Sequence, residues 1–313
     1  MTEEPNHSAR RAMTYQSLAV GEVLWDLLPT GKQLGGAPAN FTYHCRALGA
    51  EARLVTRVGD DDLGREVLDE FRLLGLPTGS VQVDPALPTG TVGVVLAPDG
   101  QPRFTILENA AWDRITADEA ALASAAQADA VCFGSLAQRS EPARRAIRTL
   151  VSAARPGALR VFDVNLRPPF VDPAVIADSL GLADALKLND QELPELVAMF
   201  GLPAGVRESM AELARRFGLS VVALTRGAGG ALLLADGLWS ENPGRPAAVC
   251  DTIGAGDAFT AALVVGLLAG RPLDEINRHA NEVAAFVCSR PGGTPTLPDA
   301  LKHPAVAPPS ARS

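Results

Sequence analysis

Short apolar runs of strand length alternate with segments of helical periodicity along most of the chain. This alternation is typical of α/β proteins and predicts a doubly wound, mostly parallel sheet joined by right-handed crossovers. Strands are predicted at about 17–22, 53–57, 129–134, 159–164, 185–188 and 220–225. Helices are predicted near 40–48, 63–74, 117–127, 141–154, 190–200, 208–217, 255–270 and 273–289. Thr116 and Glu119 have capping-box spacing ahead of the third of these helices.

One region breaks the alternation. Residues 90–96 and 103–107 are two β-type runs on either side of Pro98-Asp99-Gly100. Asp-Gly between two such runs is a hairpin signal, and no helix covers this hairpin in the sequence. We therefore expect it to form a small separate sheet together with residues from about 23–34.

A glycine turn precedes the helix predicted from residue 255. Residues 251–257 read DTIGAGD, and residues 261–268 are mostly apolar. Glycines let the backbone approach a ligand closely, and a helix N-terminus favours an anion such as a phosphate. Asp257 in the first turn would suit removal of the proton from an attacking hydroxyl. The alternative is an ordinary α/β loop in which Asp257 only complements the helix dipole.

A second segment of small residues lies near the start of the chain. Residues 35–40 read GGAPAN and follow the first predicted strand. Asp26 and Asn40 are thereby expected near the carboxyl end of that strand, where ligands of open α/β sheets bind. A short carboxylate and a short amide suit a polyhydroxylated ligand. The alternative is a plain loop in which Asn40 caps the following helix.

Composition narrows the range of functions. A chain of 313 residues with 47% hydrophobic content is long enough for one large α/β domain with a small appendage, or for two domains. The net charge of −8 argues against nucleic-acid binding. No segment has the apolar length of a membrane span, and residues 1–15 lack an apolar signal core, so we expect a cytoplasmic protein. Residues 1–15 and 303–313 are expected to be disordered tails.

The cysteines and histidines give no metal-ligand spacing. The cysteines are widely spaced in apolar surroundings and are expected to be buried free thiols: Cys45, Cys132, Cys250 and Cys288. His44 and His279 lie on predicted helices and are interpreted as surface or packing residues.

Together the two glycine segments resemble the ribokinase-like (PfkB) carbohydrate kinases, and most of all the bacterial fructokinases. Matching stretches also lie between them: 133–136 (FGSL), 163–167 (DVNLR), 187–192 (KLNDQE) and 225–230 (TRGAGG). The resemblance covers about residues 16–300. It implies a single ribokinase-like kinase domain, with a β-sheet lid over the sugar formed from about 23–34 and 88–110.

The resemblance also implies an activity: ATP-dependent transfer of the γ-phosphoryl group to a hydroxyl of a sugar. Asp257 would be the general base, and the backbone N–H groups of Gly254, Ala255 and Gly256 would form the anion hole. Ala37 follows the double glycine where kinases of phosphorylated sugars can carry a basic residue. The expected substrate is therefore an unphosphorylated sugar, with fructose first.

Further roles carry over from the family to matching positions. On the sugar side these are Asp26, Gly36, Asn40, Arg103 and Arg167. On the ATP side they are Asn189, Thr225, Gly227, Gly230 and Asn281. Glu192 would hold Mg²⁺ through ordered water, and Asp251 with residues near 289–294 would form a site for a monovalent cation such as K⁺. Asn189 or Asp190 could instead simply cap the next helix, with Glu192 in its first turn.

Other functions fit less well. A dinucleotide oxidoreductase would need Gly-x-Gly-x-x-Gly after a strand, and the turn at 254–259 lacks the third glycine. A P-loop NTPase fails because Gln33 follows Gly31-Lys32. A non-catalytic sugar sensor on the same fold stays open, as do ribose, 2-keto-3-deoxygluconate and nucleosides as substrates. A lid exposes sheet edges, so a homodimer that pairs two lids is also expected.

Overall fold

A computed structural model describes residues 14–28, 31–96, 102–245 and 248–302 of the chain. Its largest sheet has nine strands in the order β13-β12-β11-β10-β9-β8-β1-β4-β5. The strands are β1 (Gln16–Val20), β4 (Glu51–Gly59), β5 (Val81–Asp84), β8 (Ala130–Gly134), β9 (Leu159–Asp163), β10 (Ala185–Asn189), β11 (Val221–Thr225), β12 (Ala231–Ala235) and β13 (Leu238–Asn242). Neighbouring strands are parallel from β5 to β11, and β12 and β13 are antiparallel additions at one edge.

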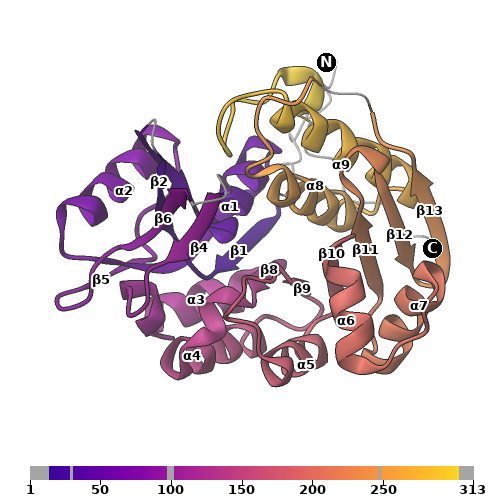
Figure 1. Cartoon of the computed structure of the whole chain (residues 1–313), viewed down its shortest axis with the longest axis horizontal. Coiled ribbons are helices and arrows are strands. Elements are labelled where there is room, and N and C mark those ends of the chain that lie inside the picture. The colour runs from indigo at the N-terminus through magenta and orange to yellow at the C-terminus, as the bar shows by residue number, and fades with distance from the viewer. Residues whose placement is uncertain (1–13, 29–30, 97–101, 246–247, 303–313) are drawn as a thin grey trace, which may run out of the picture.

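Helices cover both faces of this sheet (Figure 1). One group packs on the first face: α1 (Ala37–Ala47), α2 (Asp62–Leu73), α8 (Ala255–Leu268) and α9 (Leu273–Cys288). The other group packs on the opposite face: α3 (Glu119–Gln127), α4 (Glu141–Ser152), α5 (Pro173–Leu182), α6 (Glu192–Phe200) and α7 (Val206–Phe217). Short 3₁₀ helices span Ala111–Arg114, Leu136–Arg139, Gly227–Gly229 and Asp299–Leu301. The strands of the sheet separate two aliphatic cores, as in a doubly wound fold.

A smaller sheet stands beside the first (Figure 1). It has the order β3-β2-β6-β7, with β2 (Leu24–Leu28), β3 (Gly31–Gly35), β6 (Gly90–Leu96) and β7 (Pro102–Ile106). Strands β6 and β7 pair antiparallel, as the hairpin prediction requires, while Pro98-Asp99-Gly100 falls outside the described residues. The indole N–H of Trp25 on β2 donates to the carbonyl of Leu63, so this small sheet is tied to α2.

Several local predictions were wrong or incomplete. The cap of α3 is Asp118, whose carboxylate accepts the N–H of Ala121, and not Thr116. The backbone of Thr116 instead exchanges two hydrogen bonds with the side chain of Gln82, which holds it outside the helix. Strands β5, β12 and β13 and helix α5 were not predicted. The N-terminal and C-terminal segments expected to be disordered lie largely outside the described residues.

The cysteine prediction holds only in part. All four thiols are free, and Cys45 and Cys132 are buried, but Cys250 is exposed because residues 248–250 run along the surface. His44 and His279 are both buried packing residues. No helix in the described part of the chain is long and apolar enough to cross a membrane.

Candidate active site

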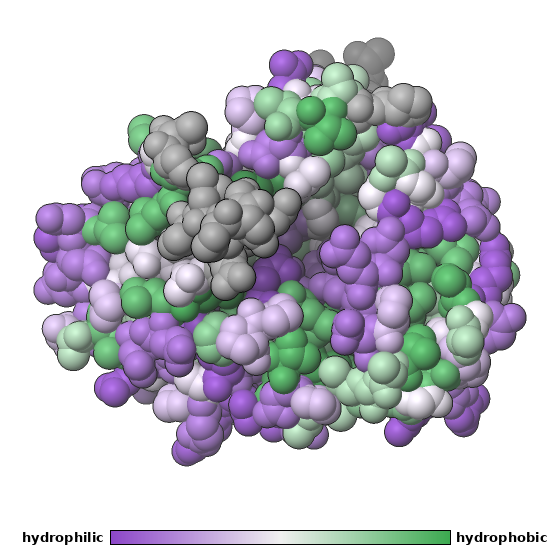
Figure 2. All heavy atoms as spheres, in the orientation of Figure 1, coloured by the Kyte–Doolittle hydropathy of each residue, from purple (hydrophilic) through white to green (hydrophobic). Residues whose placement is uncertain are grey.

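The two glycine segments meet although they are far apart in sequence. The side-chain amide of Asn40 on α1 donates to Oδ2 of Asp257 on α8 at 2.8 Å. Helices α1 and α8 pack side by side on one face of the large sheet, and both begin beside the carboxyl end of its central strands. Figure 2 shows a recess with mainly hydrophilic residues between the small sheet and the part that carries α8 and α9.

The carboxyl group of Asp257 has a raised pKa. Burial raises its pKa to about 6, and the neighbouring carboxylate of Asp163 adds to this shift. The hydrogen bond from Asn40 and the charges of Lys187 and Arg167 oppose it. At pH 7 the carboxylate is therefore mostly ionised, yet more basic than an ordinary Asp.

The turn before α8 can be built only from glycine at its key position. Gly254 has φ +75°, and a Cβ added there would lie 2.4 Å from the carbonyl oxygen of Gly293. Helix α8 starts at Ala255 with no side-chain cap. Of the three N–H groups predicted as anion donors, that of Ala255 donates to the carbonyl of Thr252 at 3.4 Å, whereas those of Gly254 and Gly256 make no backbone hydrogen bond within the described residues. A helix N-terminus of this kind favours an anion.

A cation that the sequence reasoning missed lies beside this turn. Lys187 Nζ lies 3.2 Å from the position that a Cβ on Gly256 would take. It is buried and forms an ion pair with Oδ1 of Asp163 at 3.1 Å, while Oδ2 of Asp163 accepts the Thr260 hydroxyl. Burial alone would lower the pKa of Lys187, but the surrounding carboxylates, first that of Asp163, raise it above its ordinary value. The side chain is therefore a permanent positive charge at the N-terminus of α8.

The pairing of Lys187 with Asp163 follows from strand register. The two residues are opposite each other on β10 and β9. Both lie in stretches that carried the family resemblance, but nothing local in the sequence shows that the two side chains meet. Only the pairing of parallel strands brings them together.

Asn189 and Glu192 form a reciprocal cap. Asn189 Oδ1 accepts the N–H groups of Gln191 and Glu192, and Glu192 Oε2 accepts the N–H of Asn189. The other oxygen of Glu192 accepts the N–H of Leu166 at 2.9 Å. The capping interpretation is thus present in the structure. Burial raises the pKa of Glu192, against the charge of Lys187.

The predicted metal contact is a water-mediated one from Glu192 to Mg²⁺. Each oxygen of Glu192 accepts one backbone N–H and keeps a lone pair with which to accept from an ordered water on the ion. No cluster of three or more His, Cys, Asp or Glu side chains that could hold a metal ion occurs among the described residues. A Mg²⁺ ion here would depend mainly on other oxygen ligands such as phosphates and waters.

The structure places the predicted sugar-side residues in different surroundings. Gly35 leaves room for Asp26, since a Cβ there would lie 2.4 Å from Asp26 Oδ2. Gly36 has φ +112° and packs on the carbonyl of Glu22. Burial raises the pKa of Asp26, and the charge of Arg167 opposes this.

The two arginines of the sugar-side set differ in what the structure describes. Arg167 is exposed, and its charge acts on the carboxyl groups of Glu22, Asp26 and Asp257. Arg103 lies on β7, and its side chain is outside the described part of the structure.

The predicted nucleotide-side residues divide into two groups. Thr225 lies opposite Asn189 at the end of β11, and Gly227 and Gly230 form the next turn with φ +52° and +77°. These three residues therefore lie at the same carboxyl-end edge of the large sheet as Asn189. Asn281 on α9 is buried instead, and its amide donates to Asn277, so its hydrogen bonds serve internal packing.

Asp251 joins the turn before α8 to the segment at 292. Its carboxylate accepts the N–H groups of Ile253 at 3.0 Å and Gly292 at 3.2 Å. The adjacent carbonyl of Gly293 accepts Nε2–H of His44 on α1 at 2.9 Å. Burial lowers the pKa of His44 to about 4, so the ring is neutral at pH 7 and keeps this hydrogen bond.

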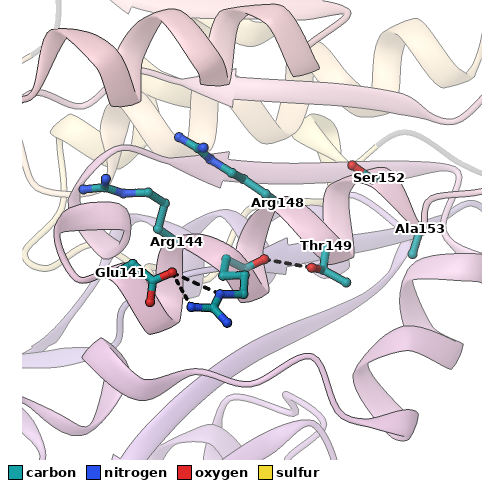
Figure 3. Close-up of a pocket in the computed structure, with 7 residues that line it drawn as sticks. Glu141, Arg144, Arg148, Thr149, Ser152 and Ala153 are labelled. Carbon is teal, nitrogen blue, oxygen red and sulfur yellow. Dashed lines mark hydrogen bonds and ion pairs between the residues drawn. The ribbon is translucent and has the colours of Figure 1, made fainter.

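A roomy hollow on the surface lies away from these residues. It has a volume of about 560 Å³ and follows α4, with Arg144 and Arg148 among its lining side chains (Figure 3). These arginines pair with Asp172 and Asp178. The hollow contains no carboxylate–amide pair like that of Asn40 and Asp257. Size alone therefore does not mark the catalytic site.

Known proteins resemble this chain over nearly its whole length. The pattern of the pfkB family carbohydrate kinases matches residues 15–300. The chain is 32% identical to a fructokinase of Klebsiella pneumoniae over 277 residues, which are 85% of this chain and 88% of that protein. The chain belongs to the pfkB family of carbohydrate kinases.

Solved structures agree with the fold of this pfkB family member. It is similar to an uncharacterized sugar kinase from Pyrococcus horikoshii in complex with ATP, with a TM-score of 0.74, 27% identity, and coverage of 89% of this chain and 94% of that one. A fructokinase from Xylella fastidiosa with bound ATP has a TM-score of 0.80 at 22% identity, over 91% and 96% of the two chains. The predicted α/β fold with a small separate sheet and the predicted family are confirmed.

Proposed function

We propose that this pfkB family kinase transfers the γ-phosphoryl group of ATP to a hydroxyl of an unphosphorylated sugar, with fructose as the preferred acceptor. The observation that carries the proposal is the Asn40–Asp257 hydrogen bond beside the uncapped N-terminus of α8. It puts a proton acceptor and an anion cradle within one turn of helix. Phosphoryl transfer needs both groups, and it needs them held in place.

Asp257 has the environment that a general base requires. Asn40 holds Oδ2, which leaves other lone pairs of the carboxylate for the proton of the sugar hydroxyl. In the proposed step that proton moves to Asp257 as the sugar oxygen attacks the γ-phosphorus, and the bond between this phosphorus and the β–γ bridging oxygen of ATP breaks. A pKa of about 6 keeps Asp257 ionised at neutral pH while leaving it basic enough to share the proton.

The transferred group would lie against the start of α8. The N–H groups of Gly254 and Gly256 and the charge of Lys187 can stabilise its oxygens, and the N–H of Ala255 would join them on giving up its long hydrogen bond to Thr252. Thr225, Gly227 and Gly230 border the neighbouring sheet edge and are proposed to contact ATP. Similarity to the Pyrococcus horikoshii sugar kinase, solved in complex with ATP, supports ATP as the donor. Mg²⁺ on the ATP phosphates, with Glu192 reaching it through water, would neutralise their charge.

The charges around the acceptor side favour a neutral sugar. Glu22, Asp26 and Asp257 bring three carboxyl groups to this side, and Arg167 is the cation whose charge opposes all three. A phosphate on the acceptor would meet predominantly negative side chains, which disfavours it. Similarity to the Klebsiella pneumoniae fructokinase supports fructose among the neutral sugars.

A substrate panel tests this proposal. ADP release is measured with Mg²⁺ and K⁺ for fructose, fructose 6-phosphate, ribose, 2-keto-3-deoxygluconate and adenosine. We expect the highest kcat/KM for fructose and no saturable turnover with fructose 6-phosphate. A higher kcat/KM for ribose, 2-keto-3-deoxygluconate or adenosine would change the assigned acceptor. ATP binding without turnover on any of them would favour a sensor.

Two further features belong to the proposal. Replacing K⁺ by tetramethylammonium at constant ionic strength should lower turnover if Asp251 and the segment near Gly292 form a cation site. Unchanged turnover would remove that site.

Strands β3 and β7 are the edges of the small sheet, and a homodimer that covers them should appear in sedimentation equilibrium. A monomer at all concentrations would contradict the dimer.

A further inference from the structure

Glu22 is a buried carboxyl group to which neither the sequence analysis nor the proposed reaction assigns a role. It follows β1 by two residues and lies between the two sheets, with 5% of its surface exposed. Its own backbone N–H donates to the carboxyl group. Oε2 has no hydrogen-bond partner among the described residues. A buried carboxyl oxygen without a partner is costly, so something is expected to satisfy it.

Oε2 of Glu22 has a place for a partner beside it. A cavity of about 20 Å³ is lined by Glu22, Asp163, Asn165 and Asp257, among others. This volume suits one water and is too small for a sugar ring. The lining is mainly apolar, but the polar side chains of Glu22, Asp163, Asn165 and Asp257 within it supply the two to four partners that one water needs. The cavity therefore links Glu22 to Asp257 without a direct contact.

The charges facing Glu22 come from three elements. Arg167 follows β9 and Arg139 ends the 3₁₀ helix at Leu136–Arg139, and both favour the ionised form of Glu22. Asp257 on α8 opposes ionisation, and Asp163 on β9 lines the same cavity. Burial is the largest effect and raises the pKa of Glu22 to about 7. Glu22 thus changes charge in the range in which the kinase would work.

We propose that Glu22 is a positioning residue for phosphoryl transfer that acts on Asp257 through one water held in the cavity that both side chains line. Asn40 fixes one side of the Asp257 carboxylate, and this water fixes the other. Asp257 is then held in one orientation toward the sugar hydroxyl. Because Glu22 has a pKa of about 7 and Asp257 one of about 6, Glu22 is largely protonated where Asp257 titrates, and its carboxyl O–H donates to this water. Ionisation of Glu22 near pH 7 then changes this hydrogen bond. The inference rests on the proposed kinase function.

The variant Glu22→Gln keeps the size of the side chain and removes its titration. We expect kcat to fall about 10- to 100-fold, with little change in the KM for ATP. The acidic limb of kcat/KM near pH 6 should keep its position, because Glu22 is already largely protonated there. The wild type should show a second change of kcat/KM near pH 7, where Glu22 ionises, and this change should be absent in Glu22→Gln. The double variant with Asp257→Asn should show no further loss beyond Asp257→Asn alone.

A purely structural role for Glu22 predicts a different result. Activity would then fall in parallel with thermal stability, while the pH profiles of the wild type and Glu22→Gln keep the same shape near pH 7, and this would overturn the proposal. If Glu22→Gln does not fold, Glu22→Asp replaces it. Glu22→Asp keeps a carboxyl group but withdraws it from the cavity, so we expect a lower kcat with the acidic limb near its wild-type position. An unchanged kcat in Glu22→Asp would equally contradict the proposal.

One readout does not depend on turnover. In protein labelled with ¹³C at the Asp carboxyl carbons, NMR titration gives the pKa of Asp257, with Asp257→Asn identifying its signal. The proposal predicts two inflections in the Asp257 signal of the wild type, one near pH 6 from its own ionisation and one near pH 7 from that of Glu22, and only the first in Glu22→Gln. A single inflection in the wild type, or two in Glu22→Gln, would overturn it even if the kinase phosphorylated a sugar other than fructose, so the two failures stay distinguishable.

Discussion

Removing the Asn40 side chain should raise the pH at which the kinase becomes active. In the structure, Asn40 donates a hydrogen bond to Asp257 at 2.8 Å and thereby lowers the pKa of this carboxyl. Asn40→Ala deletes the donor. Burial and the neighbouring Asp163 carboxylate then act on Asp257 with less opposition, so the protonated form persists to higher pH.

The size of the shift follows from the strength of one hydrogen bond. A hydrogen bond to a charged group contributes about 1.5–3 kcal/mol, and one pKa unit corresponds to about 1.4 kcal/mol. The loss would therefore raise the pKa of Asp257 by about one to two units. Asp257 retains partial exposure, and water replaces part of the lost interaction. We expect a shift of about one unit, from a pKa of about 6 toward about 7.

The assay is the pH dependence of kcat/KM for the sugar, since this ratio reports ionisations of the free enzyme. The wild type should lose activity as the pH falls through about 6, because Asp257 must be ionised to accept the proton. Asn40→Ala should lose it at higher pH. At a pH well above the Asp257 pKa of both proteins, any remaining loss of kcat/KM in Asn40→Ala would show the separate effect of weaker sugar binding.

Thr42→Val is the matched control. Thr42 lies on the same helix, is buried, and donates its hydroxyl to the carbonyl of Pro38 without touching Asp257. It should leave the acidic limb unchanged. An unshifted limb in Asn40→Ala, or an equal shift in Thr42→Val, would refute the assignment of the limb to Asp257.

Other changes test the same site. The pKa of Glu22 is raised from 4.5 to about 7 by folding, so Glu22 lowers the stability of the folded state as the pH rises through that window. Glu22→Gln should therefore raise the free energy of unfolding by up to about 3 kcal/mol near pH 8 and change it little near pH 4.5. Equal gains at both pH values would contradict this. Gly254→Ala should lower both the free energy of unfolding and kcat, because its new Cβ would meet Gly293. The control Gly75→Ala has a similar φ of +70° in open space and should lower the free energy of unfolding by only about 1 kcal/mol. Equal losses of stability would refute the close approach at Gly254. Lys187→Met leaves Asp163 as an unpaired buried charge and should cost about 3–5 kcal/mol in denaturant unfolding, and a loss below about 1 kcal/mol would mean that Lys187 and Asp163 are not paired.

Local sequence signals predicted the parts of the site that are themselves local. Gly36 and Gly254 have a positive φ that their own turns require, and this need is visible in the local sequence. The helices that follow these turns were predicted from the pattern of apolar residues. The meeting of Asn40 with Asp257 spans 217 residues and depends on how α1 packs against α8. Only the resemblance to a family could anticipate it. The contact of Lys187 with Asp163 depends likewise on strand register.

Some missed elements had signals that went unused. Strands β12 and β13 flank Asp236-Gly237, a turn in which both residues have positive φ, and Asp-Gly is a strong hairpin signal. Helix α5 begins with Asp172 as cap and Pro173 in its first turn, which is a typical start. Glu22 had no such signal, because its isolation appears only when both sheets enclose it.

The most direct test of the central claim is Asp257→Asn, measured for ADP release with fructose and for ATP binding by calorimetry. The change keeps the shape of the side chain but removes the proton acceptor. The account predicts that turnover falls by about 10³-fold or more, while ATP affinity stays within a few-fold of the wild type. Turnover within about tenfold of the wild type would contradict the claim that Asp257 is the base of this kinase.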